Sequence, residues 1–213
     1  MERTILIVDD SPYIVDGLAA LLKRKGYGTI ACNGGEEALA TLGTVQPDLI
    51  LLDIMMEPID GWETLGKIKA GSTTRDIPVL MFSSKKISLE EAEEHGMGIG
   101  DFVSKPVNPS QLLDAISRIF ERSTSVRTEA LQARDKGVDK GPIEEYSALR
   151  KGIEADKNLL VGLKKSSGTH IFGKVIPSDE PAAIGRLEAK ILAAEQRLRD
   201  TAYDSPHDYD PDI

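Results

Sequence analysis

The stretch Ile5-Leu6-Ile7-Val8-Asp9-Asp10 decides how this chain begins to fold. Four consecutive apolar residues without alternation are typical of a strand that is covered on both faces, as in a parallel sheet. Two carboxylates follow at the point where that strand should end. The same arrangement recurs at residues 49–52, which Asp53 follows. The sequence therefore predicts two buried strands with acidic side chains at their carboxyl ends.

The pattern of apolar strands and amphipathic helices continues through residue 122. Further apolar runs lie at residues 79–82 and 102–103, with a weaker one at 27–32. Stretches with helical spacing of apolar residues lie at 12–25, 35–42, 62–70, 88–95 and 109–122. Five strands that alternate with five helices predict an α/β fold with a five-stranded, parallel, doubly wound sheet.

The rest of the chain divides into segments of different character. Residues 123–142 are polar and predict a linker or a helical extension. Residues 143–202 carry two heptad-like apolar stripes, the first interrupted by Asp156, and we predict a C-terminal α-helical hairpin because each stripe needs a partner helix. The connector at 166–177 predicts a small β-hairpin or a packed loop. Residues 203–213 are acidic and contain proline, which predicts a disordered tail.

Composition narrows the range of functions. The net charge of −9 argues against a broad basic surface for nucleic acid. Cys32 is the only cysteine in the sequence, so neither an intramolecular disulfide nor a cysteine metal cluster can form. The sequence lacks a signal-peptide pattern and any apolar run of the roughly 18 residues needed to span a bilayer, and we expect a cytoplasmic protein without a membrane segment.

Polar side chains gather at one edge of the predicted sheet. In a doubly wound sheet, ligands bind at the carboxyl ends of the strands. Asp9 and Asp10 follow the first strand, Asp53 the third, Ser83 the fourth and Lys105 the fifth. Three carboxylates, a hydroxyl and an amine are therefore predicted to converge there.

Chemically, this set of groups points to phosphoryl transfer. Clustered carboxylates repel one another unless a cation offsets them, and oxygen ligands with open positions suit Mg²⁺. A carboxylate beside that ion can attack a phosphoryl group and form an aspartyl phosphate. Lys105 and the Ser83 hydroxyl could then stabilise the phosphoryl oxygens.

The first 122 residues resemble the CheY-like receiver domain of bacterial and archaeal response regulators. The matching residues are Asp9-Asp10, Asp53-Ile54-Met55-Met56, Asp60-Gly61, Ser83, Phe102 and Lys105-Pro106. Asp53 precedes Ser83 by 30 positions and Lys105 by 52, intervals that also match the family. One position departs from it: Glu57 stands where the family usually has proline, and Pro58 follows, which leaves the path of this loop open.

The resemblance implies roles for the residues that bind metal and phosphate. It implies that Asp53 is the phosphoacceptor and that Lys105 is the cation on the phosphoryl group. It also implies that Asp9, Asp10, Asp53 and the backbone carbonyl of Met55 hold Mg²⁺.

Four further roles follow from the same resemblance. Ser83 would be the switch hydroxyl and Phe102 the switch aromatic. The peptide bond before Pro106 would be cis, and Lys85 would influence the lifetime of the phosphoryl group.

These observations predict a two-component response regulator with a receiver domain at 1–122, a linker or helical extension at 123–142, a helical output domain at 143–202 and a tail at 203–213. The receiver would take its phosphoryl group from a sensor histidine kinase and would be no enzyme beyond its own Mg²⁺-dependent phosphorylation and dephosphorylation. The output would act without DNA, through an unknown downstream protein or through homodimerisation. A role of the hairpin as a stabilising cap alone also stays open.

The sequence also offers two alternative functions. The first is a transcriptional response regulator with an atypical DNA-binding C-terminal domain, but a helix-turn-helix needs a short turn and a basic recognition helix, which this chain lacks. The second is a phosphatase of the haloacid dehalogenase kind, which would need an acid/base aspartate two positions after the nucleophile. Met55 occupies that position after Asp53.

Overall fold

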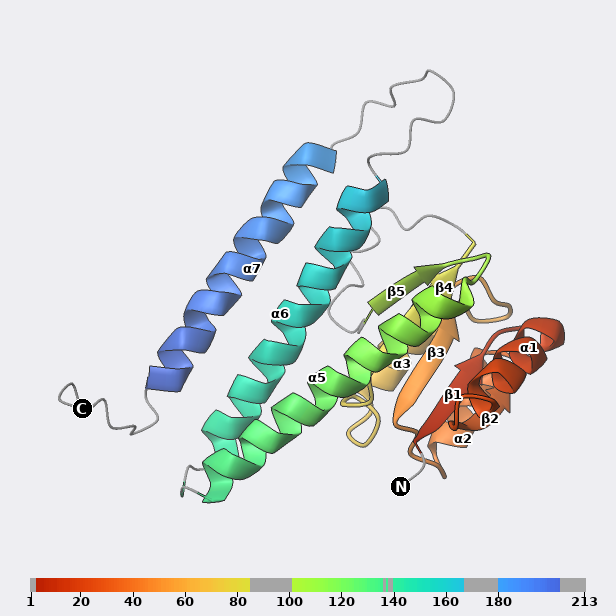
Figure 1. Cartoon of the computed structure of the whole chain (residues 1–213), viewed down its shortest axis with the longest axis horizontal. Helices are drawn as coiled ribbons and strands as arrows, with labels where there is room; N and C mark the ends of the chain where they lie inside the picture. Colours follow the sequence, from red (N-terminus) through yellow and green to blue (C-terminus); the bar gives the residue numbers. More distant parts are fainter. Residues whose placement is uncertain (1–2, 85–100, 136, 138–139, 167–179, 204–213) are drawn as a thin grey trace. The chain divides into compact units, whose positions relative to one another are not determined.

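The computed structural model describes residues 3–84, 101–135, 137, 140–166 and 180–203 of the chain (Figure 1). Its sheet contains the strands β1 (Thr4–Val8), β2 (Gly28–Cys32), β3 (Leu49–Asp53), β4 (Val79–Ser83) and β5 (Asp101–Ser104). All neighbouring strands are parallel, in the order β2-β1-β3-β4-β5. The predicted five-stranded, doubly wound sheet is confirmed.

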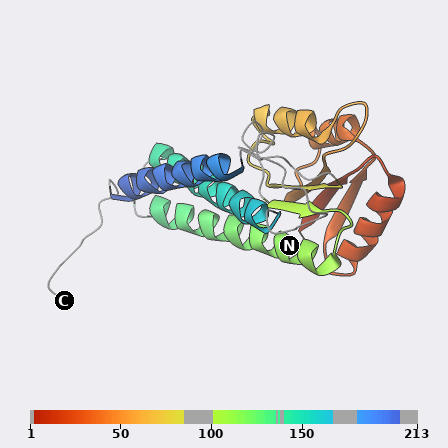
Figure 2. The same ribbon diagram turned by 90° about the horizontal axis from the view of Figure 1, so that it is seen from above.

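The helices that flank the sheet are α1 (Pro12–Lys23), α2 (Gly35–Leu42), α3 (Gly61–Ala70) and the first part of α5 (Pro109–Asp135). Figure 2 shows α2 and α3 on one side of the sheet and α1 with the start of α5 on the other. Because both faces are covered, all five residues of β3 and of β4 are buried, which explains their continuous apolar runs. The helix predicted at 88–95 lies outside the described residues.

Helix α5 is longer than the helix predicted at 109–122. It continues to Asp135 because no glycine or proline interrupts residues 123–135. Gly137 follows with a φ of 83°, a left-handed conformation that ends helices and that glycine adopts without strain. For residues 123–142, the described part is therefore helical up to Asp135 and again from Lys140.

The chain divides into two compact units, Met1–Ile119 and Phe120–Ile213, with the division inside α5. In the second unit, α6 (Lys140–Ser166) and α7 (Glu180–Tyr203) pack side by side as the predicted α-helical hairpin. Its core is formed by buried Ile153, Leu187 and Ile191, against which Leu160, Ala194 and Leu198 pack.

In the sequence, Asp156 interrupts the apolar stripe of the first helix. In the structure, it nevertheless takes part in the interface between the two helices. Its side chain is buried between the helices and forms an ion pair with Lys190, with 3.0 Å between Nζ and the carboxylate. The polar residue in the apolar stripe thus has a charged partner on the facing helix. The predicted connector beyond Ser166 and the predicted tail beyond Tyr203 lie outside the described residues.

No helix in the described part of the chain is both long enough and apolar enough to cross a bilayer.

Candidate functional site

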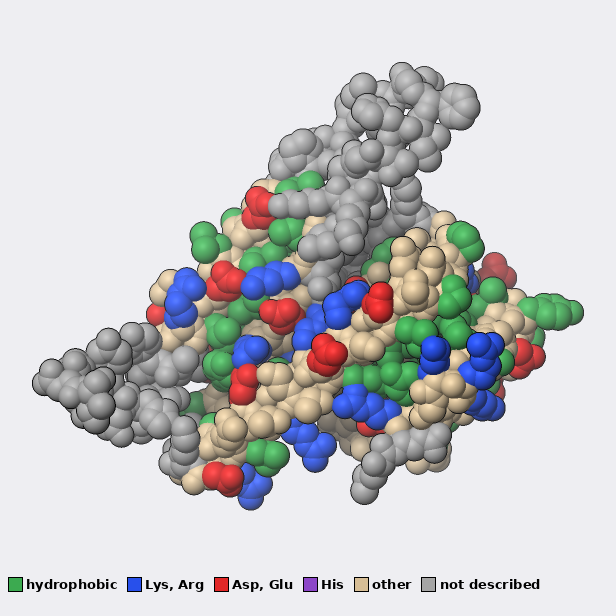
Figure 3. Space-filling model, viewed as in Figure 1, with side chains coloured by type: hydrophobic (Ala, Val, Ile, Leu, Met, Phe, Trp, Pro, Cys, Tyr) green, Lys and Arg blue, Asp and Glu red, His purple; other side chains and the backbone are tan. Residues whose placement is uncertain are grey.

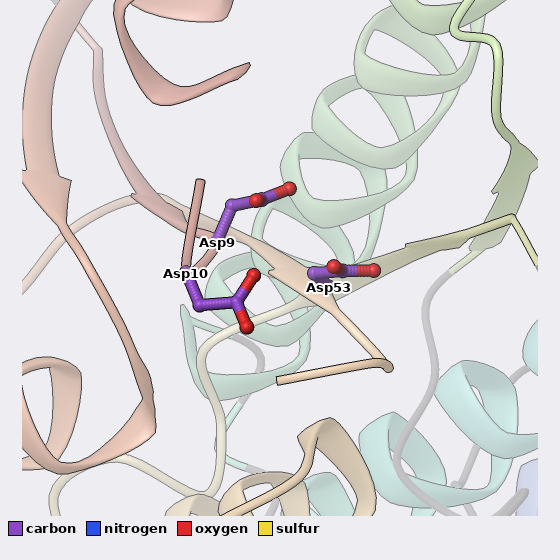
Figure 4. A group of neighbouring side chains, drawn as sticks. All are labelled: Asp9, Asp10 and Asp53. Carbon is purple, nitrogen blue, oxygen red and sulfur yellow. The ribbon is translucent and has the colours of Figure 1, made fainter. Parts of the chain in front are cut away.

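Three carboxylates meet at the carboxyl ends of β1 and β3. Asp9, Asp10 and Asp53 each offer an oxygen that lies within 4.8 Å of the others (Figure 4). The strand register produces this meeting, because Val8 pairs with Leu52 and the next residues of both strands are acidic. Asp9 and Asp53 are buried, whereas Asp10 is exposed.

Lys105 joins this cluster from the end of β5. Its Nζ donates hydrogen bonds to Oδ2 of Asp9 at 2.7 Å and to Oδ2 of Asp53 at 2.8 Å. Its backbone N–H donates to the carbonyl of Ser83 at 2.7 Å, which ties the lysine to the end of β4. The structure therefore brings together the acids and the amine that the sequence placed at one edge.

The cluster carries more negative than positive charge. Burial raises the pKa of Asp53; the hydrogen bond and charge of Lys105 lower it, the charge of Asp9 raises it further, and the net shift is upward. Burial lowers the pKa of the Lys105 ammonium, but its hydrogen bonds to Asp53 and Asp9 and their charges outweigh this and raise the pKa. The cluster contains three carboxylates and one ammonium. A further cation would therefore reduce the repulsion between the carboxylates.

One oxygen in the cluster lacks a partner. Oδ1 of Asp53 is buried and has no hydrogen-bond partner among the described residues. By contrast, Asp9 uses both oxygens, since Oδ1 accepts from the Ser11 backbone N–H at 2.8 Å and Oδ2 accepts from Lys105. A buried anionic oxygen without a donor is costly unless something binds it. Together with the exposed carboxylate of Asp10, it forms an all-oxygen donor set that fits a hard divalent cation.

The structure describes most of the other residues that the resemblance implies. Ser83 is buried at the end of β4, next to the residue that pairs with Asp53. Phe102 is partly buried and packs against the core on one face of the sheet. The Lys105–Pro106 peptide bond is cis, as implied, and Lys85 lies outside the described residues.

Met55 lies at the exposed side of the site. About half of its surface is exposed, and Oγ of Ser84 donates to its Sδ at 3.8 Å. The loop that contains Met55 continues through a cis peptide bond between Glu57 and Pro58. This is the loop whose path could not be predicted from the sequence.

Gly61 has a role that the sequence did not reveal. Its N–H donates to the carbonyl of Ile54 at 2.8 Å, so α3 begins against the end of β3. A Cβ on Gly61 would lie 2.7 Å from Cα of Ile54 and would also overlap the backbone oxygen of Asp53. Asp60 caps the same helix by accepting from the Glu63 N–H at 2.8 Å. The pair Asp60-Gly61 was visible in the sequence, but its contact with the end of β3 depends on tertiary structure.

Phe82 is a second residue that the sequence reading did not connect with the site. Nζ of Lys105 lies over its ring, 4.9 Å from the ring centroid. In the sequence Phe82 belongs to an apolar run, which predicts a buried strand and nothing about the site.

Comparisons with known proteins agree with this geometry. Residues 5–117 match the family model described as the response regulator receiver domain, and residues 122–202 match the model described as "Metanogen output domain 2". The alkaline phosphatase synthesis transcriptional regulatory protein PhoP of Bacillus subtilis is 34% identical over 123 residues, which cover 58% of this chain and 50% of PhoP. Protein PilG of Pseudomonas aeruginosa is 35% identical over 112 residues, which cover 53% of this chain and 83% of PilG.

The fold is also similar to that of a solved receiver structure. The chemotaxis protein CheY4 of Vibrio cholerae superposes with a TM-score of 0.53 at 28% identity, covering 56% of this chain and 99% of CheY4. The chain spans about half the length of several curated relatives that it matches. The family model, however, covers more than half of this chain. The chain therefore belongs to the response regulator receiver family of two-component signalling, and a segment that matches an output-domain model follows its receiver domain.

Proposed function

We propose that this protein accepts a phosphoryl group on Asp53 from a sensor histidine kinase, with Mg²⁺ as cofactor, and that its C-terminal helices transmit the signal. The observation that carries the proposal is the position of Asp53. Its Oδ2 is held by Lys105 while its buried Oδ1 has no partner among the described residues. A buried nucleophile of this kind is poised to bind a cation and to form a new bond.

The residues available for Mg²⁺ follow from the hydrogen bonds. Asp10 and Asp53 offer oxygens that accept no hydrogen bond within the cluster. Asp9, whose oxygens both accept hydrogen bonds, adds a third negative charge that attracts the cation. The backbone carbonyl of Met55 is a further proposed ligand. When bound, Mg²⁺ would neutralise the carboxylates and the incoming phosphoryl oxygens.

In the proposed reaction, a carboxylate oxygen of Asp53 forms a bond to phosphorus while the bond between phosphorus and the histidine nitrogen of the donor breaks. Lys105 is close enough to follow the charge from the carboxylate to the phosphoryl oxygens, because it already donates to Asp53. Hydrolysis of the acyl phosphate by water restores the carboxylate. No other substrate is turned over in this proposal.

Ser83 and Phe102 are the proposed switch. Ser83 is buried one residue beyond the partner of Asp53 in the sheet register, and Phe102 is only partly buried against the core. In the proposal, phosphorylation draws the Ser83 hydroxyl toward the new oxygens and Phe102 changes its position in response, which shifts the population of two conformations of the receiver. Lys85, beyond the described residues, is proposed to influence phosphoryl lifetime.

For the output, the hairpin favours protein contacts over DNA. Helices of 27 and 24 residues pack against each other. A helix-turn-helix, by contrast, joins its two helices by a short turn. On the face of the α6–α7 hairpin that Figure 3 shows, acidic and basic side chains of the described residues are intermixed, and no basic patch is seen there. The partner is proposed to be a downstream protein or a second copy of the chain.

DNA binding is the second candidate, because one similar protein is named as a transcriptional regulator and another as a DNA-binding regulator. One is the transcriptional regulatory protein PhoP, and the other is the DNA-binding response regulator MtrA of Mycolicibacterium smegmatis, 28% identical over 139 residues. A gel-shift assay with duplex DNA, run with phosphorylated and unphosphorylated full chain, separates the candidates. Salt-dependent retention of DNA would favour the second one.

The phosphorylation test uses a small phosphodonor such as acetyl phosphate with Mg²⁺. The full chain should gain one acid-labile phosphoryl group, and Asp53→Asn should gain none. Asp16→Asn, which removes an exposed carboxylate of α1 and the same charge, is the matched control and should behave like the wild type. Equal labelling of Asp53→Asn, or consumption of the donor that continues unchanged in Asp53→Asn, would disprove the proposal.

A further inference from the structure

The ammonium of Lys105 has an aromatic ring as its third neighbour. Besides the oxygens of Asp9 and Asp53, Nζ faces the ring of Phe82 at 4.9 Å from the centroid. Phe82 is 1% exposed and the side chain of Lys105 is 17% exposed. The cation is therefore largely withdrawn from water and is held from several sides by protein groups.

The sheet register explains why the ring lies there. The Cα of Phe82 pairs with that of Asp53 on one side and with that of Val103 on the other. Side chains alternate between the faces of a sheet, so paired residues share a face. Met81, the preceding residue, belongs to the core on the opposite face. Lys105 follows Val103 by two positions, and its side chain reaches Asp53 across the strand that carries Phe82.

The choice of an aromatic residue matters electrostatically. A buried ammonium that loses water needs replacement partners. The two carboxylates supply two of them, and the negative face of an aromatic ring supplies a further attraction for a cation within about 6 Å of its centroid. A leucine at position 82 would fill a buried strand position equally well but would present no such face.

We propose that Phe82 is a positioning residue of the phosphoryl-transfer site: its buried ring holds the Lys105 ammonium between Asp9 and Asp53 through a cation–π interaction. This inference rests on the proposed function in one respect, namely that Lys105 assists the transfer. The position of the ammonium itself can be measured without any phosphorylation.

The experiment replaces Phe82 in the full chain with phenylalanine analogues that carry one, two or three ring fluorines. Each fluorine weakens the negative face of the ring while its size changes little. Two quantities are measured: the exchange rate of the Lys105 Nζ protons with water, by NMR of ¹⁵N-lysine-labelled protein, and the rate of phosphorylation by acetyl phosphate with Mg²⁺. Urea unfolding of every variant verifies that it is folded.

We expect proton exchange to accelerate and phosphorylation to slow stepwise with the number of fluorines, by about 2- to 30-fold across the series. Phe82→Leu should resemble the most fluorinated protein in both quantities. If proton exchange is the same throughout the fluorinated series, the ring is only part of the core and the inference is wrong, even where Phe82→Leu differs. If exchange responds but no protein in the series, wild type included, is phosphorylated, the ring does position Lys105 and the proposed function is what fails. If exchange responds and phosphorylation proceeds at an unchanged rate, the proposed function stands and the role of Phe82 in transfer is refuted.

Discussion

The carboxylate of Asp156 in α6 is buried and pairs with the ammonium of Lys190 in α7 at 3.0 Å. This pair lies in the same interface as the apolar contacts of Ile153 with the facing helix. Only Asp156 is buried in this pair, since half of the Lys190 side chain is exposed. Removal of the ammonium is costly because the carboxylate that remains is buried. A polar pair within an apolar stripe can also specify which residues face each other.

The first prediction concerns this pair. Lys190→Met should destabilise the hairpin by about 1.5–3 kcal/mol, since it leaves the Asp156 carboxylate buried without its cation. The double variant Asp156→Leu with Lys190→Met should recover most of that loss. Hydrogen exchange of the α7 backbone amides measures both effects.

The control for the hairpin is Lys157→Met. Its ion pair with Glu195 joins the same two helices at 2.7 Å, but both side chains are more exposed than Asp156. Water therefore screens the remaining carboxylate, and the effect should be clearly smaller than that of Lys190→Met. Equal losses in the two variants would show that the burial of Asp156 has no energetic consequence.

A second prediction follows from the raised pKa of Asp53. Because this pKa is higher in the folded than in the unfolded chain, the folded state binds more protons in the pH range from the ordinary value of 3.8 upward to the raised value. The contribution of Asp53 to the stability of the metal-free protein should therefore fall as pH rises through that range. Asp53→Asn should lack this decrease, so that its stability advantage over the wild type widens with pH. Urea unfolding in the presence of EDTA measures the difference, and a gap that narrows with rising pH would contradict the assignment; Asp16→Asn serves as the control.

The third prediction tests Mg²⁺ binding. A ligand that binds only the folded state raises the unfolding temperature as its concentration rises. Mg²⁺ should do so for the wild type and much less for Asp10→Asn or Asp53→Asn, because both substitutions replace a charged carboxylate of the proposed site with a neutral amide. Asp10 is exposed, so its substitution should leave the stability in EDTA nearly unchanged. An equal Mg²⁺ response in wild type and Asp10→Asn would place the ion elsewhere.

The fourth prediction compares two glycines of α3. Gly61→Ala should destabilise the receiver by about 1–3 kcal/mol, because its Cβ would overlap the backbone at Asp53 and Ile54. Gly66→Ala should instead stabilise it by about 0.5–1 kcal/mol, since a Cβ at Gly66 meets nothing within 4 Å and alanine favours the helix. Thermal unfolding of both variants measures the contrast, and a similar loss in the two would refute the close approach at Gly61.

The sequence predicted the edge of the sheet well, for a physical reason. Parallel strands all end on the same side, so residues that directly follow apolar runs must meet there, whatever the details of packing. This was enough to bring Asp9, Asp10, Asp53 and Lys105 together. The sequence left residues 123–142 open between a linker and a helical extension, because the polar composition of this segment does not distinguish the two; the structure shows that α5 extends to Asp135, with no breaker before Gly137.

The sequence by itself determined the strands, their direction and the acidic edge, since these follow from local apolar patterns and from the geometry of parallel sheets. Only the tertiary structure decided which groups contact one another across strands and helices: Lys105 bridges Asp9 and Asp53 above the ring of Phe82, and Asp156 pairs with Lys190. Such contacts depend on register between segments far apart in the chain, and an apolar run or a lone charge looks the same in sequence whichever neighbour the register provides.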